Sequence, residues 1–190
     1  MTTTRGRLFV IAAPSGAGKT TLRDFLLKRH PDLYFSVSAT TRRPRPGEVI
    51  HKDYHFMTKD VYDQRLAQDA FLEHAEVFGN YYGTLRAPVE QQLAAGRDVL
   101  LDVDTKGARQ VKQQMPEALL VFIMPPSMQE LERRLRARGA DREEDIQRRL
   151  REAQYEMDQR GIFDHIVVND CLADAQRALE QLFYPATVTP

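Results

Sequence analysis

The sequence predicts an α/β protein in which helices cover both faces of a mainly parallel β-sheet. Three apolar runs, at residues 8–12, 98–104 and 119–124, have the length and composition of buried strands. Each is followed by a stretch with helical spacing, and strands that alternate with helices usually pair in parallel. The run at 98–104 ends in aspartate, at the sheet edge where open α/β sheets bind ligands.

The composition limits the kind of protein. A chain of 190 residues suits one domain with inserted lobes, and 42% hydrophobic with 28% charged residues is typical of a soluble globular protein. We expect no membrane partner, because no apolar run is long enough to span a bilayer. The absence of a signal-peptide pattern and the single Cys171 predict a cytoplasmic protein. The net charge of zero predicts no nucleic-acid partner, whereas clustered arginines indicate small phosphorylated ligands.

The first predicted strand, at about 7–13, leads into a loop with the pattern of a phosphate-binding loop. Residues 13–20 read Ala-Pro-Ser-Gly-Ala-Gly-Lys-Thr, and a helix is predicted from about 19 to 30. The N–H groups of such a loop converge on an anion at the helix N-terminus. We expect Lys19 to reach the outer phosphates and Thr20 to bind Mg²⁺. Ala13 replaces the first glycine of the pattern, and an ordinary strand-to-helix turn is the alternative.

A basic loop follows the short strand predicted at 34–38. Two prolines and a glycine exclude regular structure at 40–48, and Arg42 and Arg45 can be turned to one side. Arginine presents a planar pair of donors that matches phosphate oxygens. A solvated surface turn is the alternative interpretation.

The middle of the chain predicts a small region of short strands inserted into the main sheet. We expect strands at 53–57 and 71–78, a helix at 59–69 with Val61, Tyr62 and Leu66 directed inward, a glycine-bounded turn at 79–84 and a helix at 88–95. The last of these helices returns the chain to the main sheet.

The C-terminal half is expected to alternate helices and strands. Helices are predicted at 105–114, at 127–138 after a Ser127 cap, at 142–160 and at 172–182, with a last strand at 164–169. Arg134 and Arg138 are four residues apart and therefore lie on one helix face, and Arg149 follows on the next helix. A solubilising arginine face is the alternative for these residues.

Together these motifs resemble guanylate kinase. They are the phosphate loop, Ser-Ala-Thr-Thr-Arg-Arg-Pro-Arg-Pro-Gly-Glu at 38–48, Phe-Leu-Glu at 71–73, Gly-Asn-Tyr-Tyr-Gly-Thr at 79–84, Leu-Asp-Val-Asp at 101–104 and Ile-Val-Val-Asn-Asp at 166–170. The resemblance extends over 6–184 and implies Mg²⁺-dependent phosphoryl transfer from ATP to GMP on a P-loop NTPase-type fold. It also implies a core at about 6–37, 97–126 and 160–184, an inserted GMP-binding lobe at 38–96 and a helical lid at 127–159.

The resemblance assigns site residues position by position. The implied ATP-binding residues are Ala13, Pro14, Ser15, Gly16, Ala17, Gly18, Lys19, Thr20 and Asn169. The implied GMP-binding residues are Ser38, Arg42, Arg45, Tyr54, Glu73, Tyr82, Thr84 and Asp102. The residues implied in catalysis are Lys19, Arg42, Arg134, Arg138 and Arg149, and the implied Mg²⁺ ligand is Thr20. Lys106 stands where the family usually has glutamine, and this departure leaves its role open.

The chemistry of guanine supports the assignment of Glu73. Guanine has donors at N1 and N2 and an acceptor at O6, so an ionised Glu73 can accept from both donors while Ser38 and Thr84 donate to O6. Adenine at the same site would leave buried polar groups unpaired. No general base is needed, because a phosphate monoester with a second pKa of about 6 is already largely ionised. The reaction instead requires alignment of the phosphates and neutralisation of their charge.

Two other functions fit parts of the pattern. A non-catalytic guanylate-kinase-like module that binds phosphopeptides is one, but it has no use for Gly18, Lys19 and the lid arginines. A kinase for another phosphorylated small molecule is the other, and Glu73 with Thr84 argues against it. The sequence does not predict the oligomeric state, the kinetic constants or the regulation. It also does not predict whether dGMP is accepted or where exactly the lid begins and ends.

Overall fold

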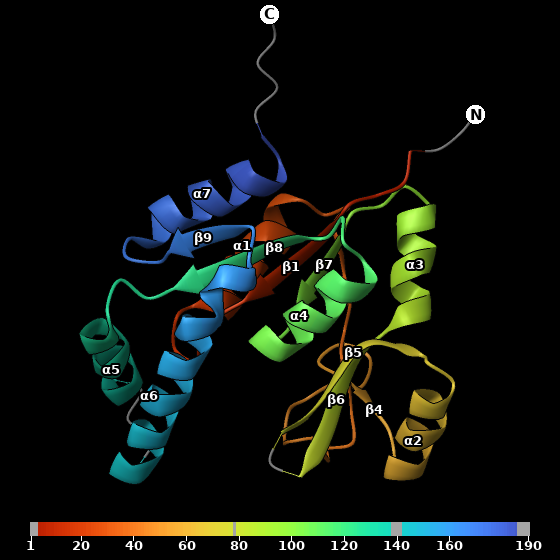
Figure 1. The fold of residues 1–190 in the computed structure, drawn as a ribbon, viewed down its shortest axis with the longest axis horizontal. Coiled ribbons are helices and arrows are strands. Elements are labelled where there is room, and N and C mark those ends of the chain that lie inside the picture. Colours follow the sequence, from red (N-terminus) through yellow and green to blue (C-terminus); the bar gives the residue numbers. More distant parts are fainter. Residues whose placement is uncertain (1–3, 78, 138–141, 186–190) are drawn as a thin grey trace, which may run out of the picture. The chain divides into compact units, whose positions relative to one another are not determined.

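A computed structural model describes residues 4–77, 79–137 and 142–185. Its elements (Figure 1) are, in chain order, β1 (Leu8–Ala12), α1 (Lys19–Arg29), β2 (Tyr34–Phe35), β3 (Ala39–Thr40), β4 (His55–Phe56), α2 (Lys59–Ala67), β5 (Phe71–Val77), β6 (Asn80–Leu85), α3 (Arg86–Ala94), β7 (Val99–Asp102), α4 (Thr105–Gln114), β8 (Leu119–Met124), α5 (Met128–Ala137), α6 (Glu143–Asp158), a 3₁₀ turn (Gln159–Ile162), β9 (His165–Val168) and α7 (Leu172–Phe183). Within these ranges every helix is too short or too polar to cross a membrane. Arg138 lies outside the described residues.

The strands form two sheets. The central sheet has the order β2-β7-β1-β8-β9, and the pairs β2 with β7 and β8 with β9 are parallel. The second sheet has the order β4-β3-β6-β5. The predicted α/β class with a parallel central sheet is therefore confirmed. The chain divides into two compact units, a first unit of residues 1–10 and 32–119 and a second unit of residues 11–31 and 120–190.

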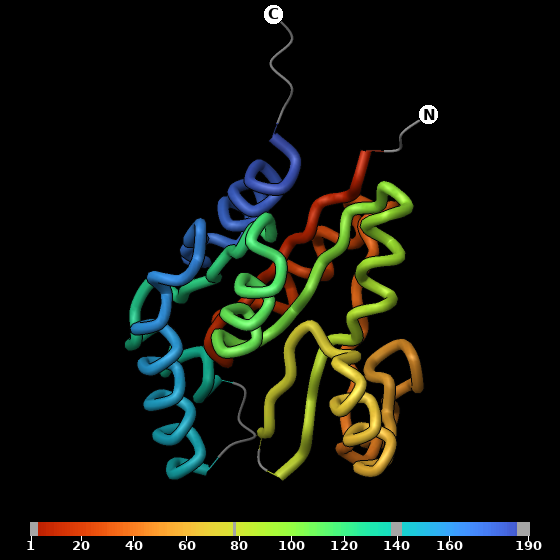
Figure 2. Tube along the Cα trace, turned by 45° about the vertical axis from the view of Figure 1, so that its right-hand side comes forward, coloured from red at the N-terminus to blue at the C-terminus, as the bar shows by residue number. Residues whose placement is uncertain are grey.

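The first unit contains the four-stranded sheet and helices α2, α3 and α4. Strands β5 and β6 form an antiparallel hairpin, which is yellow in Figure 2. Ala39, Tyr62 and Phe71 form a buried cluster under this sheet. The Tyr62 hydroxyl is satisfied by donation to the backbone carbonyl of Tyr82 at 2.9 Å. Helix α4 packs against β5, so the strand at the edge of the sheet is covered.

The prediction of a glycine-bounded turn at 79–84 is wrong, because Asn80–Leu85 is the strand β6. Gly79, with a φ of 74°, belongs to the hairpin turn, but Gly83 lies inside the strand. A Cβ at Gly83 would lie 2.7 Å from Cδ1 of Phe71 and 2.8 Å from the carbonyl oxygen of Glu73. Gly83 is therefore required by a close approach across the hairpin rather than by a turn.

Three smaller predictions also differ from the structure. The strand predicted at 34–38 is shorter, since β2 covers only Tyr34–Phe35 and pairs with β7 in the central sheet, and the next strand, β3, begins at Ala39 in the second sheet. In α2, Val61 and Leu66 are each 38% exposed, so their predicted inward direction is wrong, whereas Tyr62 is fully buried. Helix α3 begins at Arg86 and not at Pro88, because proline is tolerated in the first helical turn.

The second unit surrounds the predicted phosphate loop with helices. Strand β8 is fully buried from residue 120 to residue 123. Helices α5 and α6 lie side by side (Figure 1) and bury Leu131, Leu135 and Ala153 between them. Helix α1 packs on α7, and Glu180 of α7 forms hydrogen bonds with both Arg29, at 3.1 Å, and His30, at 3.0 Å. These contacts fix the helix that begins at the loop.

Candidate nucleotide-binding site

The loop between β1 and α1 has a backbone suited to an anion. Gly16 and Gly18 have φ angles of 95° and 93°, a region that residues with side chains rarely occupy. The Ala17 N–H donates to the Pro14 carbonyl at 3.1 Å and closes the turn. Within the described ranges, no side chain caps the N-terminus of α1. Its N–H groups and partial positive charge can therefore bind a phosphate.

Neighbouring side chains also limit the size of loop residues. A Cβ at Gly16 would lie 2.9 Å from Cδ1 of Leu131 in α5, and a Cβ at Gly18 would collide with Nδ2 of Asn169. Steric room and backbone conformation thus require glycine at both positions. Ala13 is different, because it is buried without a positive φ. This explains how alanine can replace the first glycine of the pattern.

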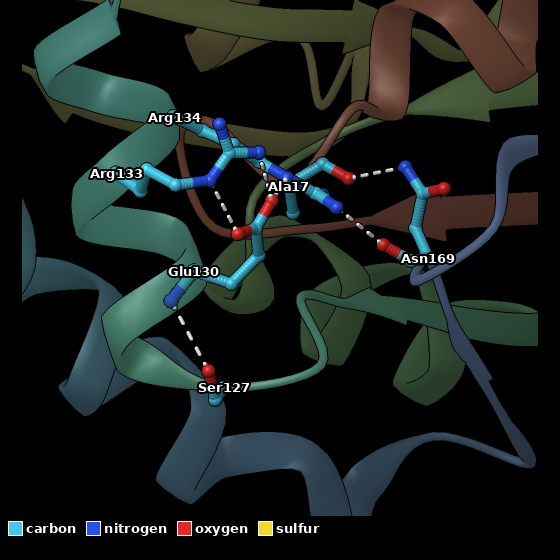
Figure 3. A network of polar contacts seen from close by, with 6 residues as sticks. All are labelled: Ala17, Ser127, Glu130, Arg133, Arg134 and Asn169. Carbon is cyan, nitrogen blue, oxygen red and sulfur yellow. Dashed lines mark hydrogen bonds and ion pairs between the residues drawn. The ribbon is translucent and has the colours of Figure 1, made fainter.

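Asn169 connects the loop to helix α5 (Figure 3). Its Nδ2 donates to the Ala17 carbonyl at 2.8 Å, and its own backbone carbonyl accepts from Nη2 of Arg134 at 2.9 Å. Glu130 accepts from Nε of Arg134 at 2.8 Å. Ser127 caps the helix by accepting the Glu130 N–H at 3.1 Å, as the sequence predicts. The structure therefore places the Asn169 amide on the loop backbone and holds the Arg134 guanidinium beside it.

The remaining predicted residues of the second unit lie on two helices. Lys19, half-buried, and Thr20, exposed, form the first turn of α1, and Arg149 is half-buried on α6. Thr20 offers a hydroxyl oxygen, which fits Mg²⁺ because this ion usually takes few protein ligands and completes its shell with phosphates and water. The described part of the chain contains no cluster of three or more His, Cys, Asp or Glu side chains suited to a metal.

In the first unit, Glu73 and Thr84 form a buried polar pair across the hairpin. They are directly opposite in the β5–β6 register, and the Thr84 hydroxyl donates to Oε1 of Glu73 at 2.7 Å. Glu73 is 6% exposed and Thr84 is 1% exposed. Burial raises the pKa of Glu73, and the hydrogen bond from Thr84 opposes this rise. Because the Thr84 hydroxyl gives its proton to Glu73, it is not placed to donate to guanine O6 as predicted from the sequence.

Arg42 is held by an acidic neighbour in its own loop. Glu48 accepts from Nη1 and Nη2 of Arg42 at 3.0 and 2.7 Å, and from the N–H of Arg45 at 2.7 Å. These donors, Arg42 first, lower the pKa of Glu48 to about 2. The Arg42 guanidinium also lies 5.2 Å from the ring centroid of Tyr54, a cation–π distance. The Arg42 side chain is therefore oriented without a ligand. A ligand anion would have to compete with the Glu48 carboxylate for the Arg42 guanidinium.

The other predicted residues of the first unit make contacts of several kinds. The rings of Tyr54 and Tyr82 are 6.0 Å apart in an edge-on arrangement. Burial raises the pKa of Tyr54, and the negative charge of Asp102, at the carboxyl end of β7, adds to the rise. Ser38 accepts the N–H of His55 through its backbone carbonyl at 2.9 Å. Arg45, in contrast, is exposed.

Sequence reasoning missed several residues that shape these groups. Glu48 could have been found, since it is the acid inside an arginine-rich loop. Glu130 could also have been found, because it lies four residues before Arg134 on a predicted helix. Gly107 could not, because a glycine inside a helix indicates no particular neighbour. A Cβ at Gly107 would lie 2.7 Å from Oε2 of Glu73.

Comparisons with known proteins agree with one another. A family model described as guanylate kinase matches residues 5–185. The chain is 52% identical over 182 residues to the guanylate kinase of Synechococcus sp. (strain JA-3-3Ab), covering 96% of this chain and 84% of that protein. It is 53% identical over 168 residues to the guanylate kinase of Escherichia coli (strain K12), covering 87% and 81%. The crystal structure of guanylate kinase from Anaplasma phagocytophilum aligns with a TM-score of 0.74 at 30% identity, covering 94% of this chain and 85% of that chain.

Proposed function

The chain belongs to the guanylate kinase family and is a phosphotransferase that acts on GMP, and we propose that its phosphate loop binds ATP while its four-stranded sheet binds GMP. The assignment of GMP to the four-stranded sheet rests on the buried pair of Glu73 and Thr84. A carboxylate with little exposure at this position can accept from a ligand with donors, and the N1 and N2 groups of guanine supply two.

In this proposal Glu73 recognises the base, and Thr84 orients the Glu73 carboxylate. The Thr84 hydrogen bond occupies Oε1 of Glu73, so it fixes the carboxylate and favours its ionised form. Ionised Glu73 accepts from guanine, whereas adenine presents an acceptor at N1 and lacks the N2 amine. Ser38 is the remaining candidate donor to O6. Selectivity then follows from the polar groups that the wrong base leaves unpaired.

The GMP phosphate is assigned to the group around Arg42. Arg42 and Arg45 supply positive charge, and Tyr54 and Tyr82 supply hydroxyl donors. Asp102 is assigned to the same nucleotide. Because Glu48 already holds Arg42, phosphate must compete with a carboxylate for the guanidinium. The pairing with Glu48 holds the two Arg42 donors in position, but it also neutralises part of the positive charge of Arg42.

The ATP phosphates are assigned to the second unit. The N–H groups of the loop at 13–20 hold the anion, and Lys19, Arg134, Arg138 and Arg149 neutralise charge during transfer. Thr20 is the proposed Mg²⁺ ligand, and the bound ion would add positive charge beside the phosphates. Asn169 supports this site by holding the Ala17 carbonyl away from the anion. No residue is required as general base, since the attacking phosphate oxygen is already ionised.

We also propose the division into a core, a GMP-binding lobe at about 38–96 and a lid at about 127–159, and a cytoplasmic location. The phosphopeptide-binding alternative is not favoured by any observation within the described residues.

The test measures ADP formation with GMP, dGMP, AMP, UMP and CMP, for the parent protein and for Glu73→Gln. We expect GMP to be the best acceptor, and we expect Glu73→Gln to lower kcat/KM for GMP about a hundredfold because its amide presents a donor to guanine N1 or N2. The ratio of kcat/KM for GMP to kcat/KM for AMP should fall as well. A preference of the parent protein for AMP would contradict the assignment of the base site.

A further inference from the structure

We propose that one face of helix α4, formed by Gly107, Gln110 and Gln114, positions Glu73 and thereby sets the selectivity of the enzyme for GMP. This inference rests on the proposed role of Glu73 in binding guanine. The three residues are positioning residues, because they act through Glu73 and the backbone next to it.

Gln110 binds the strand as a neighbouring strand would. Its Oε1 accepts the N–H of His74 at 3.0 Å, and its Nε2 donates to the carbonyl of His74 at 2.9 Å. His74 directly follows Glu73 in β5. Strand β5 is the edge of its sheet, so these backbone groups point away from β6. One side-chain amide therefore satisfies both backbone groups of the residue after Glu73.

Gln114 holds the residue on the other side of Glu73. Its Nε2 donates to the carbonyl of Leu72 at 2.9 Å, and its own Oε1 accepts from Arg86. Arg86 in turn donates to the carbonyl of Phe71 at 3.1 Å. The backbone is therefore fixed immediately before and immediately after Glu73.

The spacing explains how one helix makes both contacts. Four residues of an α-helix rise about 6 Å, and two residues of a strand span about 6.8 Å, so Gln110 can reach His74 while Gln114 reaches Leu72. Gly107 lies on the same face, one turn earlier. There the helix needs a hydrogen in place of a side chain, because a Cβ would lie 2.7 Å from Oε2 of Glu73 and 3.2 Å from its Cδ. Gly107 thus limits where the carboxylate can lie, and Thr84 holds its other oxygen.

Apart from the room that it leaves beside Glu73, and beside Cβ of Val103 at 3.2 Å, glycine inside this helix has no evident advantage. Alanine is favoured over glycine at interior helical positions, and Gly107 has no positive φ. Its N–H donates to the Asp104 cap, which alanine could also do. The predicted consequence is that Gly107→Ala displaces the Glu73 carboxylate, which is proposed to recognise the base.

The test uses three single variants, Gly107→Ala, Gln110→Met and Gln114→Met, in the full chain. The methionine variants retain approximate side-chain shape and remove the amide. Gln113→Met is the matched control, because Gln113 is exposed on the same helix and outside this face. For each protein we would measure the melting temperature, kcat, KM for GMP and for ATP, and the ratio of kcat/KM for GMP to that for AMP.

We expect the KM for GMP to rise about tenfold in Gly107→Ala and about fivefold in each methionine variant, with a lower GMP to AMP ratio and an unchanged KM for ATP. The control should stay within about twofold of the parent. A loss of properly folded protein alone would lower apparent kcat for both acceptors equally and leave the ratio unchanged. If Gly107→Ala does not fold, the two methionine variants decide the result.

Folded variants that keep the parent KM for GMP and the parent ratio would overturn the inference, provided that Glu73→Gln changes both. If Glu73→Gln changes neither, the proposed function of Glu73 is what fails. The two failures are therefore distinguishable in the same set of assays.

Discussion

The phosphate loop of the second unit and the four-stranded sheet of the first unit are built in opposite ways. The loop is a short contiguous segment whose main features are backbone N–H groups and two glycines with positive φ. The sheet collects side chains from residues between 38 and 84, and several of them are held by partners of their own. Anion binding by the loop backbone should therefore weaken when a side chain is added at its glycines, whereas base selection in the sheet should weaken when one of its polar side chains is removed.

This difference has a physical cause. A phosphate is a compact anion that needs many donors around it, and consecutive N–H groups at a helix N-terminus provide them without side chains. A base must be distinguished from similar bases, which requires donors and acceptors at defined positions in a water-poor site. Such positions come from side chains fixed by neighbours. The buried Glu73 shows the cost, since burial raises its pKa.

The largest effect is expected for Lys19→Met, which removes the cation of the loop. We expect turnover to fall at least about a thousandfold, because Lys19 is proposed to neutralise the transferring phosphates. Calorimetric titration with GMP should show affinity close to that of the parent protein. Loss of GMP binding together with turnover would break the proposed separation of the two sites.

A smaller loss is expected for Gly18→Ala, with Gly47→Ala as its matched control. The two glycines have similar φ angles, 93° and 88°, but a Cβ at Gly47 meets no atom within 4 Å, whereas one at Gly18 collides with Asn169. Both variants should lose about 1 kcal/mol of unfolding free energy from backbone strain. Gly18→Ala should in addition raise the KM for ATP about tenfold. Urea unfolding measures the loss of unfolding free energy, and steady-state kinetics measure the KM for ATP. Equal KM values for ATP in the two variants would contradict the steric argument.

In the sheet, Thr84→Val tests the partner of Glu73. The Thr84 hydrogen bond lowers the pKa of Glu73, so its removal should raise that pKa further. If ionised Glu73 binds guanine, the acid limb of the pH profile of kcat/KM for GMP should move to higher pH, and the KM at neutral pH should rise about fivefold. The parent profile is the control, since titration of the GMP phosphate is common to both. An unshifted acid limb would mean that Thr84 does not influence Glu73.

The smallest effect is expected for Glu48→Gln. The pKa of Glu48 is lowered from 4.5 to about 2, so the stability from its pairing with Arg42 is present above pH 4.5 and lost as the pH falls toward 2. In acid unfolding we expect the parent protein to lose stability over this window slightly more steeply than the variant. The pair is near the surface, so the effect on KM for GMP should be under about twofold. A larger decrease in KM would show that Glu48 competes strongly with phosphate.

Local segments of the sequence were sufficient for much of the fold. The strand, loop and helix at 8–29 were predictable because the glycines, Lys19 and the apolar spacing act within a few residues of each other. The strand Leu119–Met124 and the helix Thr105–Gln114 were predicted with the bounds that the structure has, since a fully apolar run and a helical period are local signals. The order of the motifs was also sufficient to indicate the family, which the comparisons confirm.

Contacts between distant residues were decided by the tertiary structure. Gly79 and Gly83 look alike in sequence, but one forms a turn and the other makes room for Phe71 inside a strand. No local signal indicates that the Asn169 amide donates to a carbonyl 152 residues earlier in the chain. The sequence does not indicate the role of Gln110, because an amide side chain can form hydrogen bonds with any accessible backbone group. Gln110 binds His74 because β5 is the edge strand of its sheet and lies beside α4. Residue type and spacing determine local conformation, whereas which polar groups meet depends on how separate segments pack.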